Sequence, residues 1–193
     1  EKVRDNAVER HKKWVDAAYR LGSHSIRVNT NGTLVEDLWL EAAEDGLRKL
    51  ATYAATKNIN VIVENHGGFS SQPEKLMQVI NALNMPNSGT LPDFGNWCIK
   101  WDKKSKTCKL KYDDYYKGIK LMMPAAKAVS AKSNDFDENG NEIRIDYVKM
   151  LQIVKNAGYN GYIGIEYEGQ RLSELEGVIA TRDLLINAAK ELK

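Results

Sequence analysis

The apolar residues of the chain follow two alternating patterns, which predict helices and strands in turn. Apolar positions three or four residues apart, together with capping residues, predict five helices: 4–21, 38–57, 71–83, 146–157 and 173–189. Two of these begin with a capping-box pattern, at Ser71 to Glu74 and at Ser173 to Glu176. Short apolar runs predict five strands: 24–29, 59–64, 89–93, 128–132 and 161–169. The runs at 59–64 and 161–169 have the apolar content of strands buried on both faces.

The order of these elements indicates a parallel α/β sheet built from βα units. Strand centres fall roughly 30 to 40 residues apart, which is typical of such units. An open doubly wound sheet and a (β/α)₈ TIM barrel both have this order, and no glycine-rich dinucleotide loop follows any strand. Instead, three strands end in acidic residues, Glu64, Asp93 and Glu166. In a barrel such ends converge on one mouth, so the acidic residues favour the barrel.

Five strands do not close an eight-stranded barrel. Either three βα units precede Glu1 or the chain adopts a smaller open fold, and we expect one domain over residues 1–193. A barrel without three strands exposes two sheet edges, so we expect a homo-oligomer, aggregation or a need for the missing part. The chain opens at Glu1 without a methionine, so the lack of a signal-peptide pattern says little about export.

Residues 98–117 interrupt the alternation with lysines and tyrosines, and we expect an inserted hairpin or loop there. Cys98 and Cys108 flank its polar tip. A disulfide in an oxidising compartment and two free thiols in the cytosol are equally compatible with this spacing. A bridge would favour an exported or periplasmic protein over a cytoplasmic one.

The balance of charge argues against two classes of partner. The chain has 28 basic and 26 acidic residues and a net charge of +2, which does not predict a nucleic-acid or anionic-membrane surface. No apolar run approaches the length of a membrane span.

The three carboxylates at the strand ends point to a cation site. Carboxylates crowded at one mouth repel one another and take up protons unless a positive charge lies among them. Oxygen ligands suit Mg²⁺ or Mn²⁺ better than Zn²⁺. A single acidic residue at a strand end is more often a helix cap or an ion-pair partner, but three at matching positions favour the site.

Four segments, VIVENHGG, GTLPDFGNW, AVSAKSNDFD and GYIGIEYEG, occur in this order along the chain. Together they resemble the sugar phosphate isomerase/epimerase family, the xylose isomerase-like TIM barrels, which also include the family 2 AP endonucleases. The resemblance implies that the five strands are the fourth to eighth of a barrel. It also implies a metal held by Glu, Asp, His and Glu, with Glu64 first, Asp93 second and Glu166 fourth.

The chain departs from the family pattern at two positions. At the third ligand position the family has His-x-Lys, and this chain has Ser130 followed by Lys132. The family often has a histidine three residues after the aspartate, where this chain has Asn96. Three alternatives follow: a metal held by three carboxylates, waters and His66; a site without metal, in which Lys132 supplies the positive charge; or a barrel that only binds.

Further side chains are candidates for the site, each with a structural alternative. Lys132 and His66 join Glu64 and Glu166 as proposed catalytic groups, although Lys132 could pair with acids outside the mouth and His66 could anchor a loop. The proposed substrate-binding residues are Arg27, Asn96, Trp97 and Glu168. Arg27 could equally pair with an acid, and Trp97, with Trp101, could pack a hairpin rather than stack on a sugar.

The resemblance predicts a sugar isomerase or epimerase that acts on a small-molecule sugar. One carboxylate removes a proton next to a carbonyl and a second returns it. A lyase or hydrolase on a keto-sugar or glycoside could use the same site, and a non-catalytic carbohydrate-binding barrel is the third possibility. An endonuclease is disfavoured, because it needs a histidine cluster and this chain has only His11, His24 and His66.

Overall fold

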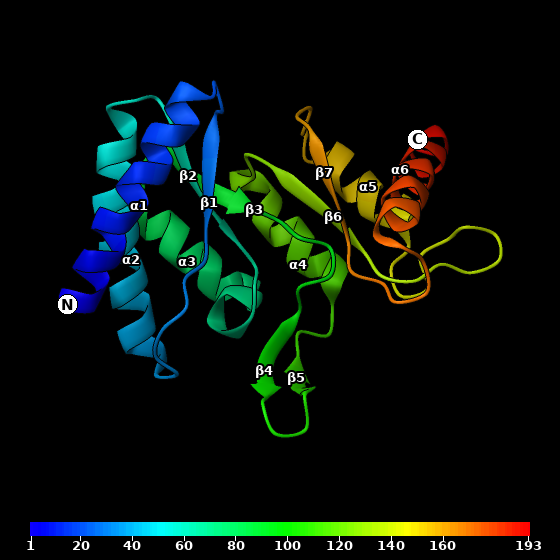
Figure 1. Ribbon diagram of the computed structural model, residues 1–193, viewed down its shortest axis with the longest axis horizontal. Coiled ribbons are helices and arrows are strands. Elements are labelled where there is room, and N and C mark those ends of the chain that lie inside the picture. Colours follow the sequence, from blue (N-terminus) through cyan, green and yellow to red (C-terminus); the bar gives the residue numbers. More distant parts are fainter.

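The computed structural model describes residues 1–193 and shows five parallel strands that form an arc covered by helices (Figure 1). Strands β1 (Ser25–Val28), β2 (Asn60–Glu64) and β3 (Ser88–Leu91) form one parallel sheet, and β6 (Val129–Ser133) and β7 (Ile163–Tyr167) form another. Two parallel bridges join the sheets, Thr90 to Ala126 and Asp93 to Ser130. The strand order 1-2-3-6-7 is that of part of a TIM barrel.

Six α-helices accompany the strands: α1 (Lys2–Arg20), α2 (Glu36–Ala55), α3 (Pro73–Leu83), α4 (Tyr115–Met122), α5 (Tyr147–Asn156) and α6 (Glu174–Lys190). Short 3₁₀ turns lie at Gly68–Ser71 and Met123–Ala125. The core fills the space between helices and strands, with Val61 and Val63 of β2 packed in one cluster with Leu47, Leu76 and Ile119 of α2, α3 and α4. No helix has the length and apolar content needed to cross a membrane.

Two sequence predictions about caps had different outcomes. The capping box at the start of α6 is confirmed, because Ser173 and Glu176 exchange side-chain and backbone hydrogen bonds. The capping box predicted at Ser71 is wrong. Helix α3 starts at Pro73 without a side-chain cap. The Ser71 hydroxyl instead accepts the Gly67 amide at 2.7 Å and donates to the Asn96 carbonyl, also at 2.7 Å.

Two further differences concern burial and an unexpected helix. The prediction that 161–169 is a strand buried on both faces is wrong, because β7 pairs only with β6 and leaves Ile165 37% exposed. Helix α4 was not expected, and it begins inside the segment taken as a hairpin or loop. The Asp114 side chain caps it by accepting the Lys117 amide.

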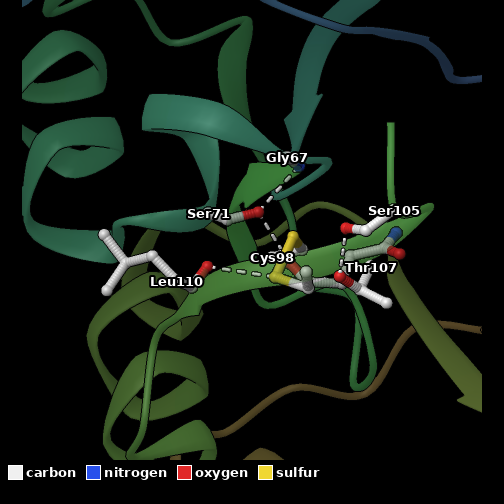
Figure 2. Close-up of a disulfide and its surroundings, with 8 residues drawn as sticks. Gly67, Ser71, Cys98, Ser105, Thr107 and Leu110 are labelled. Atoms are coloured by element: carbon white, nitrogen blue, oxygen red, sulfur yellow. Dashed lines mark hydrogen bonds between the residues drawn. A yellow bond between two sulfur atoms is a disulfide. The ribbon is translucent and has the colours of Figure 1, made fainter. Parts of the chain in front are cut away.

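An antiparallel hairpin of β4 (Cys98–Asp102) and β5 (Thr107–Lys111) follows β3. It extends away from the sheets, beyond their edge (Figure 1). Cys98 and Cys108 form a disulfide with their Cα atoms 5.8 Å apart. Of the two alternatives, a disulfide or two free thiols, the structure has the disulfide. Figure 2 shows the disulfide next to Ser71 and Gly67, in the loop after β2.

Candidate active site

Adjacent strand ends bring the predicted acidic residues together. Glu64 is the last residue of β2, and Asp93 follows β3. A parallel β-bridge joins Asp93 to Ser130 and so aligns the end of β3 with β6. In the β6–β7 pair, Lys132 lies opposite Glu166. Because parallel strands end on the same side of a sheet, residues distant in sequence meet at one mouth.

The three carboxylates form a compact set. One oxygen of each of Glu64, Asp93 and Glu166 lies within 4.8 Å of the others. Asp93 is fully buried, and neither its Oδ2 nor Oε2 of Glu64 has a hydrogen-bond partner. Buried polar oxygens normally accept hydrogen bonds, so two carboxylate oxygens without a hydrogen-bond donor in one cluster fit a divalent cation. The residues present therefore match an oxygen-liganded metal site.

Two cations flank these carboxylates. Lys132, only 3% exposed, places its Nζ 3.0 Å from Oε1 of Glu166 and 3.1 Å from Oε2 of Glu168. Arg27 Nε lies 3.0 Å from Oε2 of Glu64, close enough for an ion pair although the two atoms do not form a hydrogen bond. Arg27 is itself exposed and also donates to Asn29. Lys132 is thus the buried positive charge of the mouth.

The surroundings move the carboxyl pKa values in opposite directions. Burial raises the pKa of Asp93 to about 7, although Lys132 and hydrogen bonds to it act the other way. Burial also raises the pKa of Glu64, with Arg27 opposing. Burial acts upward on the pKa of Glu166 too, but hydrogen bonds from Lys132 and Ser130 bring it below the ordinary value. Glu166 is therefore the most readily ionised of the three.

Asn96 connects the charged groups. Its Nδ2 donates to Oε1 of Glu64 at 2.7 Å, and its Oδ1 accepts from Lys132 Nζ at 2.9 Å. Its backbone amide donates to Oδ1 of Asp93 at 2.8 Å. Since both ends of the amide side chain are occupied by protein partners, Asn96 fixes Glu64 relative to Lys132. We predicted it as a substrate-binding residue, and in the structure its side chain holds other site residues.

The remaining predicted residues are not all at the mouth. Trp97 is 2% exposed, stacks on Tyr115 at a centroid distance of 5.4 Å and donates its indole N–H to the Phe94 carbonyl. Trp97 therefore packs the base of the hairpin, and its buried ring is not placed to stack on a sugar. His66 is exposed beyond Glu64, with its backbone amide bonded to Ser70. Glu168 is exposed beside Lys132.

The sequence did not predict that Asn65 supports the site through Asp93. Fully buried, Asn65 donates to the Asp93 carbonyl at 3.0 Å and accepts the Asp93 amide at 2.7 Å. These two bonds tie the end of β2 to the segment after β3. An amide directly after the strand-end Glu64 was the available signal, because a buried amide needs partners.

The family model for xylose isomerase-like TIM barrels matches residues 1–188. The chain belongs to this family. The resemblance inferred from the four segments is therefore confirmed, and so is the fold class.

Two solved structures share this fold at low identity. A D-tagatose 3-epimerase-like protein superposes with a TM-score of 0.74 at 19% identity, covering 98% of this chain and 71% of that chain. A xylose isomerase-like TIM barrel protein from Mycobacterium smegmatis in complex with magnesium has a TM-score of 0.68 at 16% identity, covering 98% and 69%. The chain thus spans about 70% of each of these two barrels.

A curated relative matches a shorter stretch. The C-glycoside deglycosidase alpha subunit of Arthrobacter globiformis is 39% identical over 54 residues, which are 28% of this chain and 15% of that protein.

Proposed function

We propose that this barrel is a sugar isomerase or epimerase that moves a proton next to a carbonyl group. The observation that carries the proposal is that two carboxyl groups, Glu64 and Glu166, meet at one mouth with an oxygen of each within 4.8 Å of the other. Their surroundings also shift their pKa values in opposite directions. Two acids whose surroundings separate their pKa values suit a reaction in which one accepts a proton and the other supplies one.

The residues would divide the proton transfer as follows. Glu166, kept ionised by Lys132, accepts the proton from the carbon next to the substrate carbonyl, and the C–H electrons form an enediolate. Glu64, whose pKa burial raises, returns a proton to carbon or oxygen. In the reverse direction the two carboxyls exchange roles.

Lys132 acts in this scheme through the carboxylates. Its ammonium group has three donors, and three partners surround it: Asn96, Glu166 and Glu168. It therefore holds Glu166 ionised and oriented, and its charge also stabilises negative charge that develops on the substrate.

Glu64, Asp93 and Glu166 would hold the metal, and we propose Mg²⁺ or Mn²⁺ because all three ligands are carboxylates. The bound cation would polarise the carbonyl and hydroxyl oxygens of the sugar. Ser130 stands at the position where a histidine ligand is expected. Its hydroxyl donates to Oε2 of Glu166 at 3.0 Å, so it orients that carboxylate.

A lyase or hydrolase on a keto-glycoside is a second candidate, favoured by the match to the deglycosidase subunit. Its first step is the same proton abstraction. The enolate then expels the leaving group from the neighbouring carbon, and that group takes up a proton.

The test is exchange of substrate hydrogen in D₂O. Ketoses and 3-keto-glycosides are incubated with the protein and Mn²⁺, Mg²⁺ or EDTA, and NMR measures loss of the C–H signal, new epimers and released aglycone. We expect Glu64→Gln and Glu166→Gln to abolish exchange and Glu138→Gln, an exposed loop acid, to retain it. Sugar binding without exchange in any sample would instead identify a binding barrel.

A further inference from the structure

The charge of the chain is concentrated in the β4–β5 hairpin. Residues 98–111 contain one acidic residue, Asp102, and six lysines: Lys100, Lys103, Lys104, Lys106, Lys109 and Lys111. The hairpin therefore carries +5, whereas the whole chain carries +2, so the rest of the protein is at −3. The near-neutral total hides a strongly basic element.

Most of these lysines form no ion pair within the fold. All six lysines are exposed, and only Lys109 has a carboxylate partner, Asp102 at 3.7 Å. Like charges on a short two-stranded hairpin repel one another and disfavour its folding. The lysines thus work against the stability of the hairpin.

The hairpin is held in a fixed place at the rim of the mouth. The disulfide closes its stem (Figure 2). Its first residue, Cys98, comes two residues after Asn96, whose carbonyl accepts the Ser71 hydroxyl. Trp97 anchors the same end in the core. Figure 1 shows the hairpin as an arm that extends from the end of the sheets.

An exposed aromatic ring accompanies the lysines. Trp101 is 58% exposed and lies between the mouth and the tip of the hairpin. An indole ring offers a flat apolar surface that fits the C–H face of a sugar ring, and ammonium groups attract carboxylates. Bilayer insertion would need an apolar tip, but residues 103–106 read Lys-Lys-Ser-Lys. Ring and charges together fit an acidic carbohydrate chain.

We propose that hairpin 98–111 binds a carbohydrate polymer that carries carboxylates, a uronate chain, and holds it beside the mouth. Trp101 packs against a sugar ring, and the tip lysines pair with carboxylates of the neighbouring units. This is a binding surface, and it stands whether or not the proposed proton transfer is correct.

The test measures binding of the full chain to polygalacturonate, with dextran as the neutral polymer. The tip variant is Lys103→Gln, Lys104→Gln and Lys106→Gln combined, none of which pairs with an acid in the fold. We expect at least about tenfold weaker binding and a smaller dependence on salt. The matched control removes three exposed lysines elsewhere and should change binding less than about twofold: Lys2→Gln, Lys120→Gln and Lys155→Gln.

A second variant separates a sugar partner from other polyanions. Trp101→Ala should weaken binding to polygalacturonate and leave binding to inorganic polyphosphate unchanged, because polyphosphate has no sugar ring. Equal losses in the tip and control variants, equal binding to dextran, or no effect of Trp101→Ala would each overturn the proposal. So would tighter binding, per unit of charge, to a DNA oligonucleotide or to phosphatidylglycerol vesicles.

Discussion

Replacing Asp93 by asparagine should stabilise the metal-free protein at alkaline pH. Asp93 is fully buried, its Oδ1 accepts the Gly95 and Asn96 amides, and its Oδ2 has no partner. Asparagine keeps the accepting oxygen and places an N–H₂ group where Oδ2 stood, near the carboxylates of Glu64 and Glu166. The substitution thus removes a buried charge and retains the local hydrogen bonds.

The expected gain in unfolding free energy follows from the pKa of Asp93. Burial raises it from 3.8 to about 7, so the protonated form is favoured in the folded state. The stability contributed by this group is complete below pH 3.8 and is lost as the pH rises through about 7. A gap of about three pKa units corresponds to roughly 4 kcal/mol of unfolding free energy. Asparagine does not ionise and avoids this loss.

Urea unfolding, followed by tryptophan fluorescence in EDTA from pH 4 to pH 8, measures the difference. The unfolding free energy of the variant should exceed that of the wild type by a growing amount as the pH rises, reaching about 4 kcal/mol at pH 8. Asp137→Asn is the control, because the pKa of exposed Asp137 is lowered by the Asn141 amide and its loss should not stabilise at pH 8. A pH-independent difference between Asp93→Asn and wild type would refute the reasoning.

Adding Mn²⁺ should narrow the stability difference between the variant and the wild type. A ligand at one hundred times its Kd stabilises the folded state by about 2.7 kcal/mol. The wild type should gain such an increment, and Asp93→Asn should gain less because it loses a ligand charge. Equal gains in both proteins would show that Asp93 does not bind the ion.

Three further variants test the packing at the base of the hairpin, the cap of α6 and the disulfide. Gly118→Ala places a Cβ 2.6 Å from the Trp97 ring and should cost about 1–3 kcal/mol in urea unfolding; an unchanged midpoint would mean that the ring moves freely. Ser173→Ala removes the α6 cap and should lower stability by about 1 kcal/mol, which thermal melts would detect, with Ser173→Asn as the conservative comparison. Replacing Cys98 and Cys108 by serine removes a constraint worth about 3 kcal/mol in the chain-entropy model, so protease should cut the hairpin tip sooner, and equal cutting rates would contradict this.

The sequence predicted the parts of the site that depend on strands. Buried parallel strands have a strong apolar signal, and the residues that end them, such as Glu64 and Asp93, are placed by the fold itself. The bridging role of Asn96 depends on contacts with residues 32 and 36 positions away, which no local pattern encodes. Ser71 shows a different limit: the capping-box pattern was present, but a tertiary partner took the hydroxyl.

The exposure of β7 and the presence of α4 were missed for separate reasons. Apolar content reports how hydrophobic a strand is, and it does not report how many neighbours cover it, so Ile165 looked buried. Helix α4 has only eight residues and opens with two tyrosines, so its periodicity is short. Its inward face, Gly118, Ile119 and Met122, is set by tertiary packing next to the stacked rings of Trp97 and Tyr115.

The amide of Asn96 makes the junction between Glu64 and Lys132 insensitive to acidity. An amide presents one donor and one acceptor at every pH, whereas an imidazole in the same place would change from acceptor to donor as it gained a proton. Glu64 therefore keeps its hydrogen bond when the solution is acidified, and so does Lys132. The spacing that Asn96 sets between Glu64 and Lys132 therefore does not change with pH.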